Sequence, residues 1–298
     1  MKYGLSTRPF ASERLSSRLL DRILEAGFSE IEVFASRDHL DYHDPNHARD
    51  LGQWFSDFNV QLHSLHAPLS SESGMGRRGG FMISVAYRER RLRIDSMDEI
   101  KRALEVAERA PFRYLVLHLG LEGEDYELDK FDAAFTSIEH LRIFAKERGV
   151  RVLLENTVSE LGNPARLMEF LSYTRLDDVG VCFDAGHAHL TGGALEGLRT
   201  LKDRMVTAHL HDNHGEKDEH LMPMDGGEQP AAKGSARGAP SGIDWPALTT
   251  EMLRSEDVAG DLCAFVELQE PRTGSVSFSE IQRTVARLRQ MGQDEAPH

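Results

Sequence analysis

Short apolar runs alternate with stretches of helical periodicity along the whole chain. Between the runs, apolar residues recur every three or four positions, as in Leu15, Leu19 and Ile23, which predicts amphipathic helices. Gly27 and Gly149 stand where such helices are expected to end. The runs themselves are rich in β-branched and aliphatic residues and predict eight strands, at 2–7, 30–36, 60–66, 114–119, 151–157, 179–184, 205–211 and 262–268.

The regular alternation of strands and helices predicts parallel strands joined by right-handed crossovers. Eight such units in 298 residues favour a closed (β/α)8 barrel, the TIM barrel, as a single domain over 1–298. A doubly wound open sheet is the alternative, although no glycine-rich phosphate turn follows the first strand. Asp129 and Asp244 are expected to be N-caps of helices.

The predicted strands end in residues of the types that bind metals. In a barrel, the carboxyl ends of all strands meet at one mouth, where active sites form. A carboxylate buried without a cation or hydrogen-bond donors is costly, so Glu155 and Glu267, which lie in apolar strands, point to a bound cation. Six consecutive strands, the third to the eighth, deliver such residues at or just after their ends: His66, His118, Glu155, Asp184 with His187, His209 with His211, and Glu267.

Other histidines have structural interpretations. His63 lies three positions before His66, so on a regular strand its side chain points to the opposite face and is expected in core or helix-facing packing. His39, His43 and His47 follow the second strand, and we expect them in a polar loop and a helix start rather than in another site.

The motifs at the strand ends carry a resemblance to a known family. They are HAPL at 66–69, HLG at 118–120, LEN at 154–156, FDAGH at 183–187, HLHDN at 209–213, DEH at 218–220 and VELQE at 266–270. With this set, in this order, the chain resembles the xylose-isomerase-like TIM-barrel superfamily over nearly its whole length. That superfamily contains sugar and sugar-phosphate isomerases and epimerases and also endonuclease IV.

The resemblance implies a metal site at the barrel mouth. The subset Glu155, Asp184, His209 and Glu267 matches the single divalent site of the ketose epimerases. A larger set matches the positions that hold three zinc ions in endonuclease IV: His66, His118, Glu155, Asp184, His187, His209, Asp218, His220 and Glu267.

The number of candidate ligands bears on the number of ions. Four carboxylates and five imidazoles exceed the needs of one ion, since zinc usually takes about four ligands and manganese about six. The carboxylates total -4, which two divalent ions would balance. We therefore expect zinc or manganese as the cofactor, with more than one ion per chain.

The resemblance implies a metal-dependent isomerase or epimerase of a sugar, sugar phosphate or related polyol, with Glu155 and Glu267 as the catalytic pair for proton transfer. Phosphodiester hydrolysis like that of endonuclease IV, dehydration of a cyclic polyol or acid, and a non-enzymatic module that keeps the metal are the alternatives. For the small carbohydrate-like substrate, the expected contacts are Glu32, His187, His211 and Arg77, the last in a basic stretch at 77–93.

Composition and net charge indicate which kinds of binding partner are disfavoured. The chain has 35 Lys and Arg against 49 Asp and Glu, a formal net charge of -14, which opposes binding to nucleic acid or to an anionic membrane. No run approaches the roughly 18 apolar residues of a membrane span, and residues 1–30 lack the apolar core of a signal peptide. Cys182 and Cys263 lie in predicted strands, which favours reduced, buried thiols. We expect a cytoplasmic protein, and a homo-oligomer is compatible with the sequence.

Two segments depart from the family pattern. Residues 228–242 form a low-complexity insert rich in Ala, Gly, Pro and Ser, expected to be either a flexible linker or a lid over the mouth. Residues 70–93 match no family member clearly, and their basic part is either a solvated loop with a helix start or a phosphate-gripping segment. We expect substrate specificity to reside in these two segments.

Overall fold

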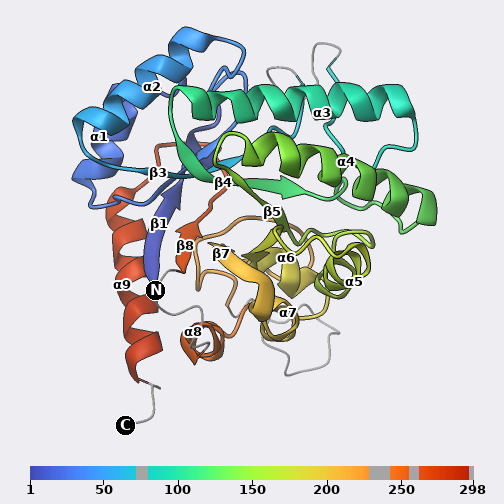
Figure 1. Ribbon diagram of the computed structural model, residues 1–298. Coiled ribbons are helices and arrows are strands. Elements are labelled where there is room, and N and C mark those ends of the chain that lie inside the picture. Colours follow the sequence, from blue (N-terminus) through green and yellow to red (C-terminus); the bar gives the residue numbers. More distant parts are fainter. Residues whose placement is uncertain (72–79, 228–241, 255–261, 295–298) are drawn as a thin grey trace.

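Eight parallel strands close into a barrel, because the first strand pairs with the eighth as well as with the second. The computed structural model describes residues 1–71, 80–227, 242–254 and 262–294 (Figure 1). The strands are β1 (Lys2–Ser6), β2 (Ile31–Phe34), β3 (Leu62–His66), β4 (Phe112–His118), β5 (Arg151–Glu155), β6 (Gly180–Asp184), β7 (Met205–Leu210) and β8 (Cys263–Val266). The prediction of a (β/α)8 barrel is confirmed, and the open-sheet alternative is wrong.

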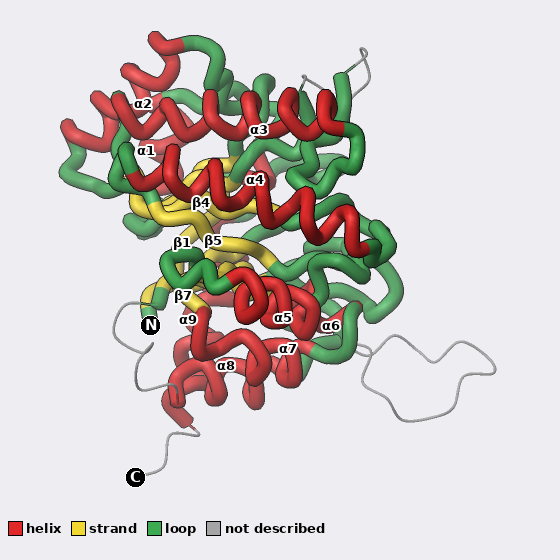
Figure 2. Tube along the Cα trace, turned by 45° about the vertical axis from the view of Figure 1, so that its right-hand side comes forward, coloured by secondary structure: helices red, strands yellow, loops and turns green. Residues whose placement is uncertain are grey.

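Helices cover the outside of the barrel, one or two after each strand (Figures 1 and 2). None of the helices in the described ranges is long and apolar enough to cross a membrane. The α-helices are α1 (Ser17–Glu25), α2 (Pro45–Asp57), α3 (Arg90–Glu105), α4 (Leu128–Lys146), α5 (Pro164–Thr174), α6 (Ala185–Leu190), α7 (Ala194–Leu201), α8 (Trp245–Arg254) and α9 (Phe278–Asp294). Short 3-10 helices are η1 (Arg8–Phe10), η2 (Val106–Glu108) and η3 (Lys202–Arg204).

Alternation along each strand separates a dry core from the mouth. Val116, Leu153 and Cys182, from three adjacent strands, pack together in a buried cluster. Two residues further along, on the same faces, stand His118, Glu155 and Asp184, because side chains of one face recur at every second position. The apolar cluster therefore forms a floor beneath the polar residues of the mouth.

Helix boundaries follow local sequence signals. Gly27 and Gly149 adopt φ of 82° and 72°, as expected for glycines that end helices. Asp244 accepts a hydrogen bond from a backbone N–H in the first turn of α8 and is the predicted cap. The prediction for Asp129 is wrong: α4 begins one residue earlier, and Glu127 is the residue with extended backbone before it.

The predicted orientation of His63 is also wrong. Pairing of β2 with β3 shifts register, so that Ile31 faces Leu62 but Glu32 faces Ser64. The irregularity breaks the alternation on which the prediction depended. The His63 ring is nevertheless buried in core packing, as predicted, where it contacts the rings of Tyr114 on the neighbouring β4 and of Phe265 on β8.

The histidines after β2 tie the loop before α2 to its surroundings. The Nδ1–H of His39 donates to the carbonyl oxygen of Glu13 at 2.6 Å, and Nε2 of His47 lies 2.7 Å from the carbonyl of Leu15. His43 is partly exposed and lies 2.9 Å from Glu99. They occupy a loop and a helix start, as predicted, but His39 and His47 are buried there.

Parts of the two unusual segments lie outside the described residues. Of the insert at 228–242, the structure describes Gly242. In the segment at 70–93, Ser70 pairs with Met82 in an isolated antiparallel bridge, and α3 begins at Arg90. In the basic stretch, residues 90–93 therefore form the start of α3, and residues 88 and 89 precede it. Arg77 lies outside the described residues.

We expect the stability of the fold to depend on pH through His39. Burial lowers its pKa from 6.5 to about 4, so the folded chain binds fewer protons than the unfolded chain between these values. The free energy of unfolding should fall as the pH drops from 6.5 to 4, by on the order of 3 kcal/mol from this residue. His39→Asn keeps an amide donor near the Nδ1 position and should flatten that part of the urea-unfolding profile.

His140→Asn, at an exposed position of α4, is the matched control for His39→Asn. Equal slopes for wild type and His39→Asn between pH 6.5 and 4 would contradict the assignment.

Candidate metal centre at the barrel mouth

Four strand ends place their side chains around one nitrogen. Nδ1 of His209 lies 3.0 Å from Glu155 Oε1, 2.7 Å from Glu267 Oε2 and 3.9 Å from Asp184 Oδ2. All four side chains are essentially fully buried. Each offers one ligand atom that lies within 4.8 Å of the ligand atoms of the other three. We call this set the central cluster.

Glu155 also belongs to a second group of ligands. Its other oxygen, Oε2, lies 3.2 Å from Nε2 of His66 and 3.2 Å from Nε2 of His118. His66 and His118 end β3 and β4, the strands that precede β5 around the barrel. We call His66, His118 and Glu155 the β3–β4 cluster.

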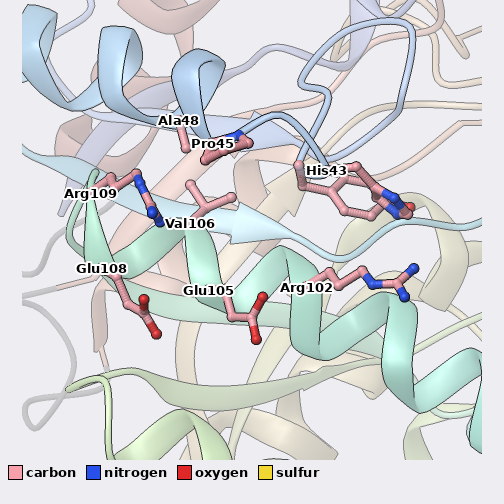
Figure 3. A pocket seen from close by; sticks show the side chains of 9 residues that line it. His43, Pro45, Ala48, Arg102, Glu105, Val106, Glu108 and Arg109 are labelled. Carbon is pink, nitrogen blue, oxygen red and sulfur yellow. The ribbon is translucent and has the colours of Figure 1, made fainter.

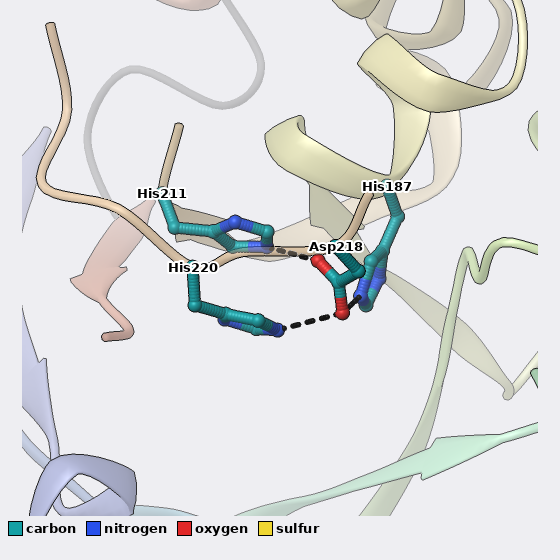
Figure 4. A group of neighbouring side chains, drawn as sticks. All are labelled: His187, His211, Asp218 and His220. Carbon is teal, nitrogen blue, oxygen red and sulfur yellow. Dashed lines mark hydrogen bonds and ion pairs between the residues drawn. The ribbon is translucent and has the colours of Figure 1, made fainter. Parts of the chain in front are cut away.

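A third group lies on the loop side of the mouth (Figure 4). Asp218 Oδ2 is 3.2 Å from His187 Nε2 and 3.0 Å from His220 Nε2, while Oδ1 is 4.0 Å from His211 Nε2. The rings of His211 and His220 are stacked with centroids 3.6 Å apart. We call these four residues the loop cluster.

The loop from 212 to 221 is folded back onto the barrel by its own backbone. Asp212 and Leu221 exchange two hydrogen bonds of 2.9 Å, which closes the loop at its base. The carboxylate of Asp212 accepts a hydrogen bond from the indole N–H of Trp245, at 2.8 Å, and so ties the HLHDN motif to the start of α8. Asp218 and His220 thereby return to the mouth.

Neighbouring elements hold the ligands of the mouth in place. Asp184 caps α6 by accepting the backbone N–H of His187 at 2.7 Å, which fixes both residues at once. Asn156 exchanges hydrogen bonds of 2.9 and 2.8 Å with the backbone of Asp184. Gly186 makes room for His211, since a Cβ there would lie 2.0 Å from the imidazole ring.

Several ligand atoms are close to each other without hydrogen-bond geometry. His118 Nε2, Glu267 Oε2 and Asp218 Oδ1 are buried and lack hydrogen-bond partners among the described residues. Nitrogen and oxygen atoms that lie 2.7–4.0 Å from one another in this way are disposed as ligands around a common point. With their mixture of imidazole and carboxylate, the residues fit zinc or manganese.

The three clusters concentrate buried carboxylates, whose negative charge must be balanced by positive charge nearby. Against the effect of burial, the charges of His209 and His118 hold the pKa of Glu155 well below its usual range. Burial likewise opposes the charge of His187, yet Asp184 and Asp218 raise the pKa of His187 to about 10. Divalent cations could replace these protons, so that metal binding would release them.

The positions predicted for substrate contact differ in their surroundings. His187 and His211 lie in the loop cluster, at the mouth. Glu32 is fully buried, and its Oε1 lies 2.9 Å from His209 Nε2, behind the central cluster.

The sequence interpretation missed Arg8, whose Nη1 donates to Glu267 Oε1 at 3.1 Å. Its position directly after the first strand is the signal that could have revealed it.

A cavity of about 310 Å³ opens beside the central cluster. Arg8 both lines this cavity and contacts Glu267. Further lining comes from Phe34, Ser36, Ser70 and Gln269. Its mixture of an aromatic ring, hydroxyls and an amide suits a small polyhydroxylated molecule.

A second cavity, of about 450 Å³, lies in the outer helical layer between the start of α2 and the end of α3 (Figure 3). His43, Arg102 and Arg109 line it together with Glu105 and Glu108. It shares no lining residue with the three clusters, so we assign the chemistry to the mouth.

Comparison with known proteins gives a family match over most of the chain. A family model described as xylose isomerase-like TIM barrel matches residues 20–260. An uncharacterized protein of Methanocaldococcus jannaschii is 27% identical over 236 residues, which cover 76% of this chain and 75% of that protein. A probable endonuclease 4 of Mycoplasmopsis pulmonis is 27% identical over 135 residues, 41% of this chain and 47% of that protein.

Solved structures show the same fold at low sequence identity. A D-tagatose 3-epimerase-like protein superimposes with a TM-score of 0.76 and 21% identity, covering 99% of both chains. The IOLI protein with a binding zinc atom gives a TM-score of 0.74 and 18% identity, covering 100% of both chains. At these identities the similarity establishes the architecture alone.

We expect metal analysis to find more than one divalent ion per chain after saturation with zinc or manganese. Asp218→Asn removes the carboxylate that joins the loop cluster and should lower the count by one, while the central cluster keeps its ligands. Elemental analysis after gel filtration measures both counts. Glu219→Gln, on the same loop but bonded to His214, is the control. A single equivalent in wild type would contradict the prediction.

Proposed function

The chain belongs to the xylose isomerase-like TIM barrel family, and from this premise we propose that it is a metal-dependent isomerase or epimerase of a sugar or related polyol. The observation that carries the proposal is the pair Glu155 and Glu267. From β5 and the end of β8, their carboxylates approach His209 Nδ1 to 3.0 and 2.7 Å. Two carboxylates thus flank one centre, as proton transfer at a single carbon requires.

Each carboxylate of the pair is held by its second oxygen. His66 and His118 contact Glu155 Oε2, and Arg8 contacts Glu267 Oε1. These contacts restrict rotation of the carboxylates and leave the opposite oxygens directed to the centre. The pair is therefore preorganised toward a substrate bound between β5 and β8.

The reaction follows from this arrangement. A divalent cation at the central cluster supplies Lewis-acid stabilisation of negative charge on substrate oxygens. One carboxylate would accept the proton from the carbon beside the carbonyl; the C–H electron pair forms a C=C bond with the carbonyl carbon and the carbonyl π pair moves to its oxygen, which gives an enediolate. In an epimerase, the other carboxylate returns a proton to the opposite face of that carbon. In an isomerase, a proton is returned to the neighbouring carbon.

The cavity beside Arg8 supports a carbohydrate-like substrate. Phe34 offers an apolar face, and Ser36, Ser70 and Gln269 offer hydrogen-bonding groups for hydroxyls. Its volume of about 310 Å³ is at the small end for ligand sites, as suits a monosaccharide. The D-tagatose 3-epimerase-like protein of the same fold is consistent with this class.

A second candidate is phosphodiester hydrolysis like that of endonuclease IV. It is favoured by the β3–β4 and loop clusters, which flank the central cluster and allow several ions to act together. The similarity to a probable endonuclease 4 points the same way. The net charge of -14 opposes it, because a DNA duplex needs many positive contacts.

We expect Glu267→Gln to abolish exchange of the substrate's α-proton with solvent deuterium, by roughly 100-fold or more, because the amide cannot accept a proton. Proton NMR in D2O with a panel of free and phosphorylated ketoses and aldoses measures exchange. Metal content is determined in parallel, so that a lost ion is distinguished from a lost base. Undiminished exchange in Glu267→Gln, or no exchange of any sugar by wild type, would refute the proposal.

The nuclease candidate has its own test. A duplex with one abasic site, incubated with zinc-loaded protein at low salt, should remain intact if the protein is an isomerase or epimerase. Denaturing electrophoresis detects nicking. Nicking by wild type that disappears in Asp218→Asn would favour the hydrolase instead.

A further inference from the structure

Glu32 is a carboxylate buried deep behind the metal centre. It lies on β2, has no exposed surface, and accepts a hydrogen bond from Ser64 Oγ at 2.7 Å through Oε2. Its Oε1 lies 2.9 Å from Nε2 of His209, and neither atom has a partner in hydrogen-bond geometry among the described residues. Nδ1 of His209 is hydrogen-bonded to Glu155 instead. A buried carboxylate held by one hydroxyl is costly unless a second group compensates its charge. His209 is the group in position to do so.

The two nitrogens of His209 face different surroundings. Nδ1 is directed to Glu155, Glu267 and Asp184, the other members of the central cluster. Nε2 is directed to Glu32, the one carboxylate within 4.0 Å of it in the described part of the chain. An imidazole coordinates an ion only through the nitrogen that carries no proton. The position of the proton therefore decides whether His209 serves the central cluster.

We propose that Glu32 is a positioning residue: with a divalent ion in the central cluster, Glu32 would hold the remaining proton of His209 on Nε2, so that Nδ1 presents its lone pair to the cluster. Ser64, Glu32 and His209 form a buried chain that fixes both the tautomer and the ring orientation. A carboxylate on the outer nitrogen also increases the basicity of the coordinating one. This inference rests on the metal centre of the proposed function and not on the reaction.

The surroundings of Glu32 favour a positioning role; the substrate contact expected from the sequence stays a prediction. A residue that binds a substrate hydroxyl must reach the mouth, but Glu32 has no exposed surface and does not line the cavity beside Arg8. Cys182 also lies close to His209, but Glu32 is the carboxylate that faces Nε2 of the ring.

The test is Glu32→Gln, which keeps the size of the side chain and an acceptor for Ser64 but removes the charge. We expect the affinity for zinc at the central cluster to fall by roughly 10- to 100-fold, measured by competition with a chromophoric chelator. Glu30→Gln is the control, since Glu30 lies two residues earlier and pairs with the exposed Lys2. Its zinc affinity should equal that of wild type.

A second measurement reads the position of the His209 proton directly. Nitrogen-15 NMR of the zinc-loaded protein should show His209 coordinated through Nδ1 and protonated on Nε2 in wild type, and a displaced Nε2 proton resonance in Glu32→Gln; an unchanged resonance would overturn the inference. Wild-type zinc affinity in Glu32→Gln would overturn the inference, and so would a lower melting temperature with unchanged affinity. If Glu32→Gln does not fold, Glu32→Asp takes its place and should show a smaller loss, with undiminished affinity again overturning the inference.

The two proposals fail in different ways. If wild type binds zinc but exchanges no α-proton of any sugar, the proposed function fails, and the zinc affinity of Glu32→Gln still decides the role of Glu32. A wild-type ring protonated on Nδ1 in the zinc-loaded protein would overturn that role.

Discussion

The structure of the mouth depends on one constraint, which is that carboxylates buried in a barrel must be balanced by positive charge. Glu155, Asp184 and Glu267 are withdrawn from water, where their charges interact strongly with each other and with every neighbour. An imidazole nitrogen lies within 3.0 Å of each, and Arg8 adds its charge at Glu267. Such a centre is stable only when protons or metal ions occupy the space between the ligands.

The barrel places most of the charged ligands at the ends of strands rather than in loops. Parallel strands bring ligands that are distant in sequence to one end of the sheet, above a floor of apolar side chains. Asp184 belongs to a strand end and also starts α6, so strand and helix are joined at a ligand. The one long connection that contributes ligands, from 212 to 221, is closed at its base by backbone hydrogen bonds. The geometry is therefore set before any ion or substrate arrives.

The sequence predicted the eight strands and the candidate ligands at their carboxyl ends, because the ends of parallel strands must meet. The two loop ligands, Asp218 and His220, were expected from the resemblance to the family. It could not predict features that depend on register or on distance across the barrel. His63 turns inward because of an irregularity between β2 and β3, which no residue pattern signals. Glu32 lies on a predicted strand, but its place behind His209 requires knowledge of how deep each strand sits. Arg8 was missed because a single arginine after a strand is common on protein surfaces.

The sharing of Glu155 by two clusters has a thermodynamic consequence. One oxygen faces His209 and the other faces His66 and His118, so ions held by the two clusters would share Glu155 as a ligand. An ion on one side fixes the carboxylate for the other but withdraws part of its negative charge. Because linkage is reciprocal, each ion changes the binding free energy of its neighbour by the same amount. If both clusters held ions, their occupancies would therefore be coupled.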